Sequence, residues 1–154
     1  MMSRISRKSV LAFVVALMAL SFTCKAQGPA GVAELKRMEY MYPDSLALKQ
    51  QIALLSLNYS ISNPKAEEVE AVMGDAEKYI RILDENPAAD PSDVLTLKGF
   101  YYLVRIVQDP AVNGRKYYME VSQNLDKALK LNPENKLAQV LRQKFYEGMN
   151  ASRP

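Results

Sequence analysis

Paired carboxylates are the side chains of this chain whose types and spacing come closest to a reacting centre. Glu67 and Glu68 are neighbours, as are Asp84 and Glu85, and two carboxylates can act as the acid and the base of glycoside hydrolysis. All four fall near the ends of expected helices, where acidic residues are ordinary, and Glu67 and Glu68 suit the positive end of a helix dipole. The sequence therefore predicts no catalytic residue, and an enzyme or enzyme inhibitor stays an alternative.

The residue types that are missing exclude several chemistries. The chain has no histidine and its single cysteine is Cys24. Zinc sites built from cysteine and histidine are therefore excluded, as are Ser-His-Asp and Cys-His nucleophile systems. Neither G-x-G-x-x-G nor G-x-x-x-x-G-K-[ST] occurs, so the common phosphate-binding loops are absent too. We expect no metal site and no cofactor.

The first 26 residues have the pattern of a bacterial signal peptide. Three basic residues precede an unbroken apolar run over residues 10–20: Arg4, Arg7 and Lys8. Small residues at Cys24 and Ala26 then match an A-x-A-like cleavage site, with Gln27 as the new terminus. The apolar run is shorter than the about 18 residues that a spanning helix needs. This pattern predicts export to the periplasm or cell envelope.

Cys24 leaves a second processing route open. Bacterial lipoproteins are cut just before a cysteine that then carries a lipid, although Ser21 and Thr23 fit that pattern poorly. An uncleaved membrane anchor is a third alternative, which the short apolar run disfavours. We expect cleavage after Ala26 and no membrane insertion afterwards, with a lipid anchor at Cys24 as the alternative.

Removing the leader changes the charge of the chain. It takes away four of the 20 basic residues and none of the 17 acidic ones, which leaves a net charge of about −1 instead of +3. Nucleic-acid binding relies on clustered lysine and arginine, so we expect no nucleic-acid partner. The remaining sequence has the length of one ordinary domain. We expect a single helical domain over residues 27–148 and a disordered tail over 149–154.

Apolar residues at helical spacing and local capping signals predict an all-α fold. Helices are expected over residues 32–41, 44–61, 64–85, 91–108, 115–131 and 133–148. Asn63-Pro64 and Asn132-Pro133 are interpreted as a cap followed by proline at the first helical position. Residues 109–114 are interpreted as a loop. Gly74 is interpreted as a point where a neighbouring helix comes close.

One helical hairpin resembles a tetratricopeptide repeat. Gly99 and Tyr102 resemble the Gly-x-x-Tyr of its first helix. The residues that resemble the end of its second helix are Leu125, Ala128, Leu129 and the segment Leu131-Asn132-Pro133-Glu134-Asn135. Two features depart from the family. Lys98 stands where leucine is usual, and Gly99 and Ala128 are separated by more residues than the matching positions of the family. The surplus implies longer helices or an enlarged loop over 109–114.

The resemblance implies antiparallel helical hairpins stacked as a short array with a C-terminal capping helix. In the family, the inner face of the first helices binds extended peptides. The corresponding partner-binding residues here are Thr96, Phe100 and Leu103, together with Tyr101. The alternative is that these side chains are simply core.

The tyrosines offer a second signal for an interface. The chain has nine tyrosines and no tryptophan, and six of them form close pairs: Tyr40 and Tyr42, Tyr101 and Tyr102, and Tyr117 and Tyr118. Interfaces are enriched in tyrosine, but the edges of a core use it too.

The leading expectation is a non-enzymatic module that binds a protein or peptide partner in the cell envelope. Two alternatives stay open. One is a helical bundle that carries a lipid or another apolar ligand. The other is a carboxylate-based envelope enzyme or enzyme inhibitor.

Overall fold

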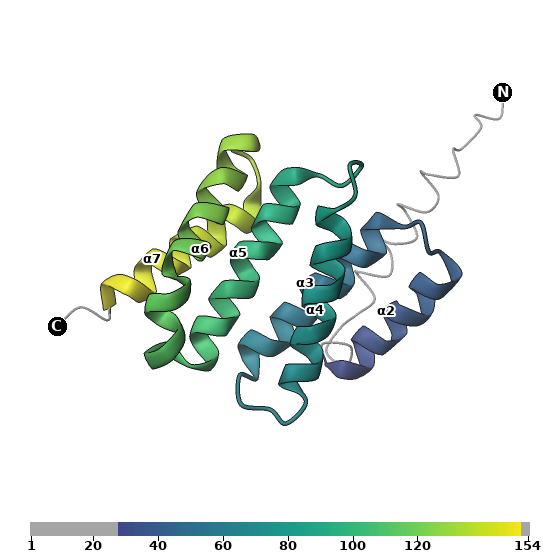
Figure 1. Cartoon of the computed structure of the whole chain (residues 1–154), viewed down its shortest axis with the longest axis horizontal. Helices are drawn as coiled ribbons and strands as arrows, with labels where there is room; N and C mark the ends of the chain where they lie inside the picture. The colour runs from purple at the N-terminus through teal and green to yellow at the C-terminus, as the bar shows by residue number, and fades with distance from the viewer. Residues whose placement is uncertain (1–27, 152–154) are drawn as a thin grey trace.

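The computed structural model describes residues 28–151, which fold into six α-helices with no strand among them (Figure 1). In chain order the helices are α2 (Pro29–Met41), α3 (Leu46–Ser62), α4 (Val69–Asp84), α5 (Pro91–Gln108), α6 (Pro110–Leu131) and α7 (Lys136–Ala151). The predicted signal peptide, with Cys24, Ala26 and the following Gln27, lies outside the described residues. The predicted all-α fold class is confirmed.

The helices form two hairpins, α3 with α4 and α5 with α6, with a single helix at each end of the row (Figure 1). The second helix of each hairpin packs on the next helix of the chain, α4 on α5 and α6 on α7. Helix α2 packs on α3 in the same relation. The first helices also contact one another, α3 with α5 and α5 with α7. This is the predicted array of hairpins with a C-terminal capping helix.

One continuous core runs through the row. Helix α4 illustrates its origin, because its apolar residues recur at helical spacing and seven of them are buried: Val69, Val72, Met73, Ala76, Tyr79, Ile80 and Leu83. Helix α3 buries Leu48, Ile52 and Leu57 completely or nearly so, and it contacts α2, α4 and α5. This helix lies in the centre of the fold, as predicted, because it is apolar on more than one side.

The three Asn-Pro pairs form turns before the helices rather than helix starts, so the predicted starts at Pro64 and Pro133 are wrong. In each turn the residue three positions on donates its N–H to the asparagine carbonyl: Ala66 to Asn63 (3.1 Å), Ala89 to Asn86 (3.0 Å) and Asn135 to Asn132 (3.1 Å). Proline then occupies the second position of the turn, where its fixed φ is favourable. Helices α4 and α7 begin only at Val69 and Lys136.

Helices α4 and α7 do not begin at these prolines because Asn63 and Asn132 close the preceding helices. The N–H of Asn63 donates to the Tyr59 carbonyl (2.9 Å) and that of Asn132 to the Ala128 carbonyl (2.9 Å). The cap of α7 is instead Asn135, whose Oδ1 accepts the N–H of Ala138 (3.1 Å).

No loop separates α5 from α6, so the loop predicted over residues 109–114 is wrong. Asp109 ends α5 through its N–H, which donates to the Arg105 carbonyl (3.4 Å). Its carboxylate accepts the N–H of Val112 (3.2 Å) and thereby caps α6. Pro110 is the first residue of α6, a position that proline favours. The extra length relative to a tetratricopeptide repeat therefore lies in helix.

Among the other helix ends, which differ from the predicted ones by at most three residues, those of α2 and α7 differ most. Helix α2 begins at Pro29 rather than at residue 32, again with proline at its first position. Helix α7 passes through Gly148 and ends at Ala151, so residues 149–151 of the predicted tail are helical.

Gly99 marks a close approach between α5 and α6. A Cβ atom at this position would lie 2.8 Å from Cδ2 and 2.9 Å from Cγ of Leu125, a fully buried residue of α6. Gly74 has no atom within 4 Å of such a Cβ, so its predicted role at a helix contact is wrong. The close approach belongs to the α5/α6 hairpin.

The two glycines predict opposite effects of alanine. Gly99→Ala is expected to lower the free energy of unfolding by about 1–3 kcal/mol, because the new methyl group displaces Leu125 in a packed core. Gly74→Ala, on an exposed helix surface, is expected to raise it by up to about 1 kcal/mol. Urea unfolding of both variants measures the difference, and a Gly99→Ala protein as stable as the parent would contradict the packing described.

Buried hydroxyl groups fall into two sets. Ser92 Oγ donates to the Ala128 carbonyl (2.9 Å) and accepts from Asn135 Nδ2 (3.0 Å). The same amide nitrogen reaches Asp93 Oδ1 (3.0 Å) and Thr96 Oγ1 (3.2 Å), which ties the start of α7 to α5. Ser56 and Ser60 of α3 are equally buried, but their hydroxyls have no hydrogen-bond partner among the described residues.

This contrast predicts stability changes of opposite sign for one type of substitution. Ser60→Ala is expected to raise the free energy of unfolding by about 1 kcal/mol, because it removes a buried hydroxyl without a partner. Ser92→Ala is expected to lower it by about 1–3 kcal/mol, because the Ala128 carbonyl and Asn135 lose a partner. Thermal or urea unfolding compares the two variants, and a destabilised Ser60→Ala protein is the contrary result.

Candidate functional site

The structure separates the four predicted partner-binding residues. Thr96 and Phe100 are buried, and the Thr96 hydroxyl donates to the Ser92 carbonyl (2.7 Å). Leu103 is half-buried against the core. Tyr101 lines an open groove on the surface. Of the four, Tyr101 therefore lies at a described cavity, whereas Thr96 and Phe100 occupy the core, in agreement with the alternative interpretation.

The groove at Tyr101 runs between the second helices of the two hairpins, with α5 as its floor. Its volume is about 380 Å³. We call it the α4–α6 groove and define it by the residues that line it: Glu77, Ile80, Arg81 and Asp84 from α4, Lys98, Tyr101 and Tyr102 from α5, and Glu120 and Asn124 from α6.

The aromatic floor of the α4–α6 groove is held in place on both sides. The rings of Tyr101 and Tyr102 meet edge to face, with centroids 5.4 Å apart, and Tyr102 packs on Tyr117 of α6 at 5.1 Å. The Arg105 guanidinium lies 5.3 Å from the Tyr101 ring centroid and donates to the Tyr101 hydroxyl (3.2 Å). Arg105 in turn pairs with Glu70 at 2.8 Å. The floor is therefore held by contacts within the chain itself.

Tyr102 presents a hydroxyl with no hydrogen-bond partner in the described part of the chain. Burial raises the pKa of this phenol, and the negative charge of Glu120 raises it further, with smaller effects from Tyr101, Tyr117 and Glu77. Glu77 and Glu120 belong to opposite walls of the groove. At neutral pH the hydroxyl keeps its proton and can donate or accept a hydrogen bond.

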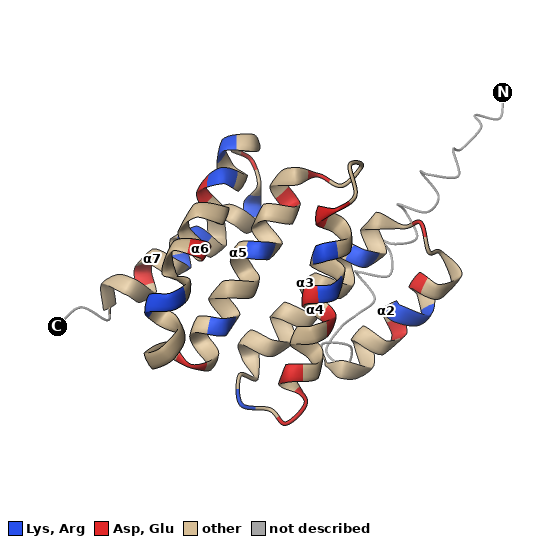
Figure 2. Cartoon of the chain, viewed as in Figure 1, with Lys and Arg blue, Asp and Glu red and all other residues tan. Residues whose placement is uncertain are grey.

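The charged groups of the groove are only partly matched. Lys98 pairs with Asp84 at 2.6 Å. Arg81, Glu77 and Glu120 are exposed and take part in no ion pair among residues 28–151. Figure 2 shows basic and acidic residues interspersed over the helices rather than gathered by sign.

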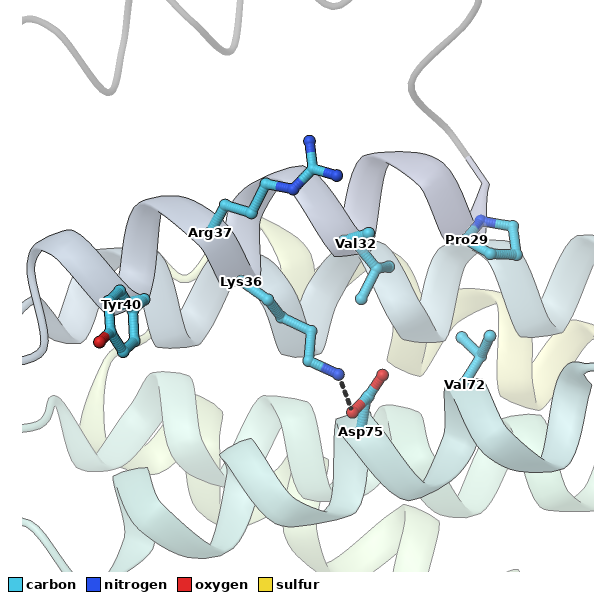
Figure 3. Close-up of a pocket in the computed structure, with 8 residues that line it drawn as sticks. Pro29, Val32, Lys36, Arg37, Tyr40, Val72 and Asp75 are labelled. Carbon is cyan, nitrogen blue, oxygen red and sulfur yellow. Dashed lines mark hydrogen bonds and ion pairs between the residues drawn. The ribbon is translucent and has the colours of Figure 1, made fainter.

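A second groove, of about 460 Å³, lies between α2 and α4 (Figure 3). We call it the α2–α4 groove. Val32 and Val72 face it from its two sides, and Lys36 of α2 reaches across to Asp75 of α4 at 2.7 Å. Tyr40 stands at one end and is 87% exposed. This groove is mainly apolar, and the chain itself supplies the ion pair that bridges it.

The two pairs of carboxylates considered for catalysis do not meet each other. Glu67 and Glu68 precede α4, whereas Asp84 and Glu85 stand at its other end, about 24 Å away at 1.5 Å per residue. Acid and base carboxylates of glycosidases lie within about 10 Å of each other. A hydrogen bond from the Tyr59 hydroxyl lowers the pKa of Glu68, which suits an anion rather than an acid. Among residues 28–151 no three histidine, cysteine or acidic residues are grouped to hold a metal ion.

No family model, curated protein or solved structure matches the chain. None of the helices described is both long and apolar enough to cross a membrane.

Several groove residues cannot be predicted from the sequence. Glu77, Arg81 and Glu120 carry no local signal, because they look like ordinary surface charges on their helices. The sequence marks Tyr102 as a repeat position, and only the pairing of tyrosines 101 and 102 points to an interface.

The electrostatic setting of Tyr102 predicts its titration. In the parent protein, the phenolate absorbance of Tyr102 is expected to develop above pH about 10, the ordinary pKa of tyrosine, because burial and neighbouring negative charge disfavour the phenolate. Tyr102→Phe is expected to remove that transition. Alkaline difference spectra of the parent and the variant measure that transition. A lost transition at or below pH about 10 would contradict a half-buried phenol between two carboxylates.

Proposed function

We propose that this chain is an exported, non-enzymatic interaction module that binds a protein or peptide partner in the bacterial cell envelope, through the α4–α6 groove. The observation that carries the proposal is the groove itself. It is open to solvent, its aromatic floor is held by Arg105 and Tyr117, and part of its charge is unmatched.

The tetratricopeptide-like character of the array is part of the proposal. Gly99 and Tyr102 face α6, where Leu125 fills the space that a side chain at residue 99 would need and Tyr117 packs on Tyr102. The pattern of contacts, with each second helix on the following first helix, is the one that stacked hairpins require. In this chain the proposed binding face lies along the second helices, because Thr96 and Phe100 on the opposite side are buried.

A pre-formed aromatic surface suits the binding of a flexible segment. Tyrosine offers a large contact area with few rotatable bonds, so little side-chain entropy is lost on binding. Tyr101 is further restrained by its hydrogen bond from Arg105. The peptide then bears most of the ordering cost, which fits a partner that is extended or unfolded before it binds.

The leader supports the proposed compartment. Basic residues, a short apolar run and small residues before Gln27 are the features of an export signal. A mature chain that begins at Gln27 contains no cysteine, so its fold relies on packing and caps and needs no oxidising environment.

Photocrosslinking from the groove tests the proposal. The full chain, leader included, is expressed in bacterial cells with p-benzoylphenylalanine at Asn124, which lines the groove, or at the exposed neighbour Gln123, which does not. Asn124 is expected to give a discrete protein adduct in the envelope fraction, and Gln123 is not. Mass spectrometry of the purified protein is expected to show Gln27 as its first residue.

Three results would contradict the proposal. Equal adducts from both positions indicate nonspecific contact, and a lipid adduct at Asn124 favours a carrier of apolar ligands. The third is a chain that stays in the cytoplasm with its leader intact. A lipidated Cys24 as the first residue would change the anchor and leave the partner-binding role standing.

A further inference from the structure

We propose that the α4–α6 groove accepts a lysine or arginine side chain of the partner peptide, held between Glu77 of α4 and Glu120 of α6 beside Tyr102. This inference rests on the proposed function, because it names the chemistry of the ligand for the same groove.

The arrangement of the two carboxylates is the first support. Glu77 and Glu120 come from opposite walls of the groove, and Tyr102 lies on the floor between those walls. The two carboxylates and the Tyr102 phenol line the same groove, and both carboxylates raise the pKa of that phenol, Glu120 more than Glu77. A cation beside that phenol gains from both charges and can donate a hydrogen bond to the free Tyr102 hydroxyl.

The charge balance is the second support. Asp84 is neutralised by Lys98, which leaves two carboxylates and the Arg81 guanidinium, a net charge of −1 for the lining. Arg81 lies four residues after Glu77, a spacing that favours pairing on a helix, yet it forms no ion pair with either carboxylate. The groove is therefore complementary to one added positive charge.

The neighbouring groove shows the interaction already made within the chain. In the α2–α4 groove, Lys36 crosses from α2 to Asp75 of α4 at 2.7 Å (Figure 3). The α4–α6 groove is the next one along the array, and no side chain of residues 28–151 reaches Glu120 in that way. A basic side chain of the partner would complete the corresponding bridge.

The apolar part of the lining selects a long side chain over a small cation. Ile80 and the rings of Tyr101 and Tyr102 can cover the methylene stem of lysine or arginine while its charged end meets the carboxylates. Two carboxylates are too few to hold a calcium ion, which takes six to eight oxygen ligands. The chemistry thus favours a peptide that inserts the long side chain of a lysine or arginine.

Selection from a library of random peptides on the immobilised full chain tests the inference. The selected peptides are expected to share a lysine or arginine at one position, and its replacement by glutamine is expected to weaken binding about tenfold. Glu77→Gln with Glu120→Gln is expected to weaken the same peptides about tenfold. Arg81→Gln is expected to strengthen them about threefold, because it removes a competing cation.

Matched variants separate the possible failures. Glu67→Gln with Glu134→Gln changes the net charge equally at exposed sites outside the groove and is expected to leave binding unchanged. Tyr101→Ala removes part of the aromatic floor and is expected to weaken binding at least about tenfold, with circular dichroism verifying that each variant is folded. Peptides that are weakened by Tyr101→Ala but unaffected by the double glutamine variant would overturn this inference and leave the proposed function standing. If no selected peptide depends on Tyr101, both fail.

Discussion

A helical hairpin in this chain has two apolar faces, and neither can remain in water. This constraint determines the length of the row and the character of its ends. Helix α3 buries residues against α2, α4 and α5 at once, so it cannot be the first helix of the fold. Helices α2 and α7 supply the missing covers. Helix α7 buries Leu141 and Phe145 and turns charged residues such as Arg142 and Lys144 outward, which ends the stacking.

Much of this fold follows from local sequence patterns. The seven buried residues of α4 are predictable because their apolar spacing is a property of that helix alone. The bounds of α5 are predictable because the capping residue Asp90 directly precedes the helix. The errors arise where one residue type serves two purposes. Asn63 and Asn132 can cap a following helix or close a preceding one, and the second use needs the hydrogen-bond partner four residues back to be known.

The candidate site is far less predictable for a physical reason. Glu77 and Glu120 are 43 residues apart and become neighbours of one groove only because α4 and α6 both pack beside α5. Nothing in either helix distinguishes these residues from other surface charges. The prediction for Thr96 and Phe100 relies on resemblance to a family whose first helices face a ligand, whereas α5 here is covered on that side by α3 and α7.

Asp109 has a consequence for how such a chain can change over evolutionary time. Because this residue ends α5 and caps α6 at once, the hairpin has no spare connecting residue, and an insertion there would separate two helices that Gly99 holds in close contact. In the Asn-Pro turns after α3, α4 and α6, no single residue both ends one helix and caps the next. We therefore expect inserted residues to be accommodated better at the turns before α5 and α7 than between α5 and α6.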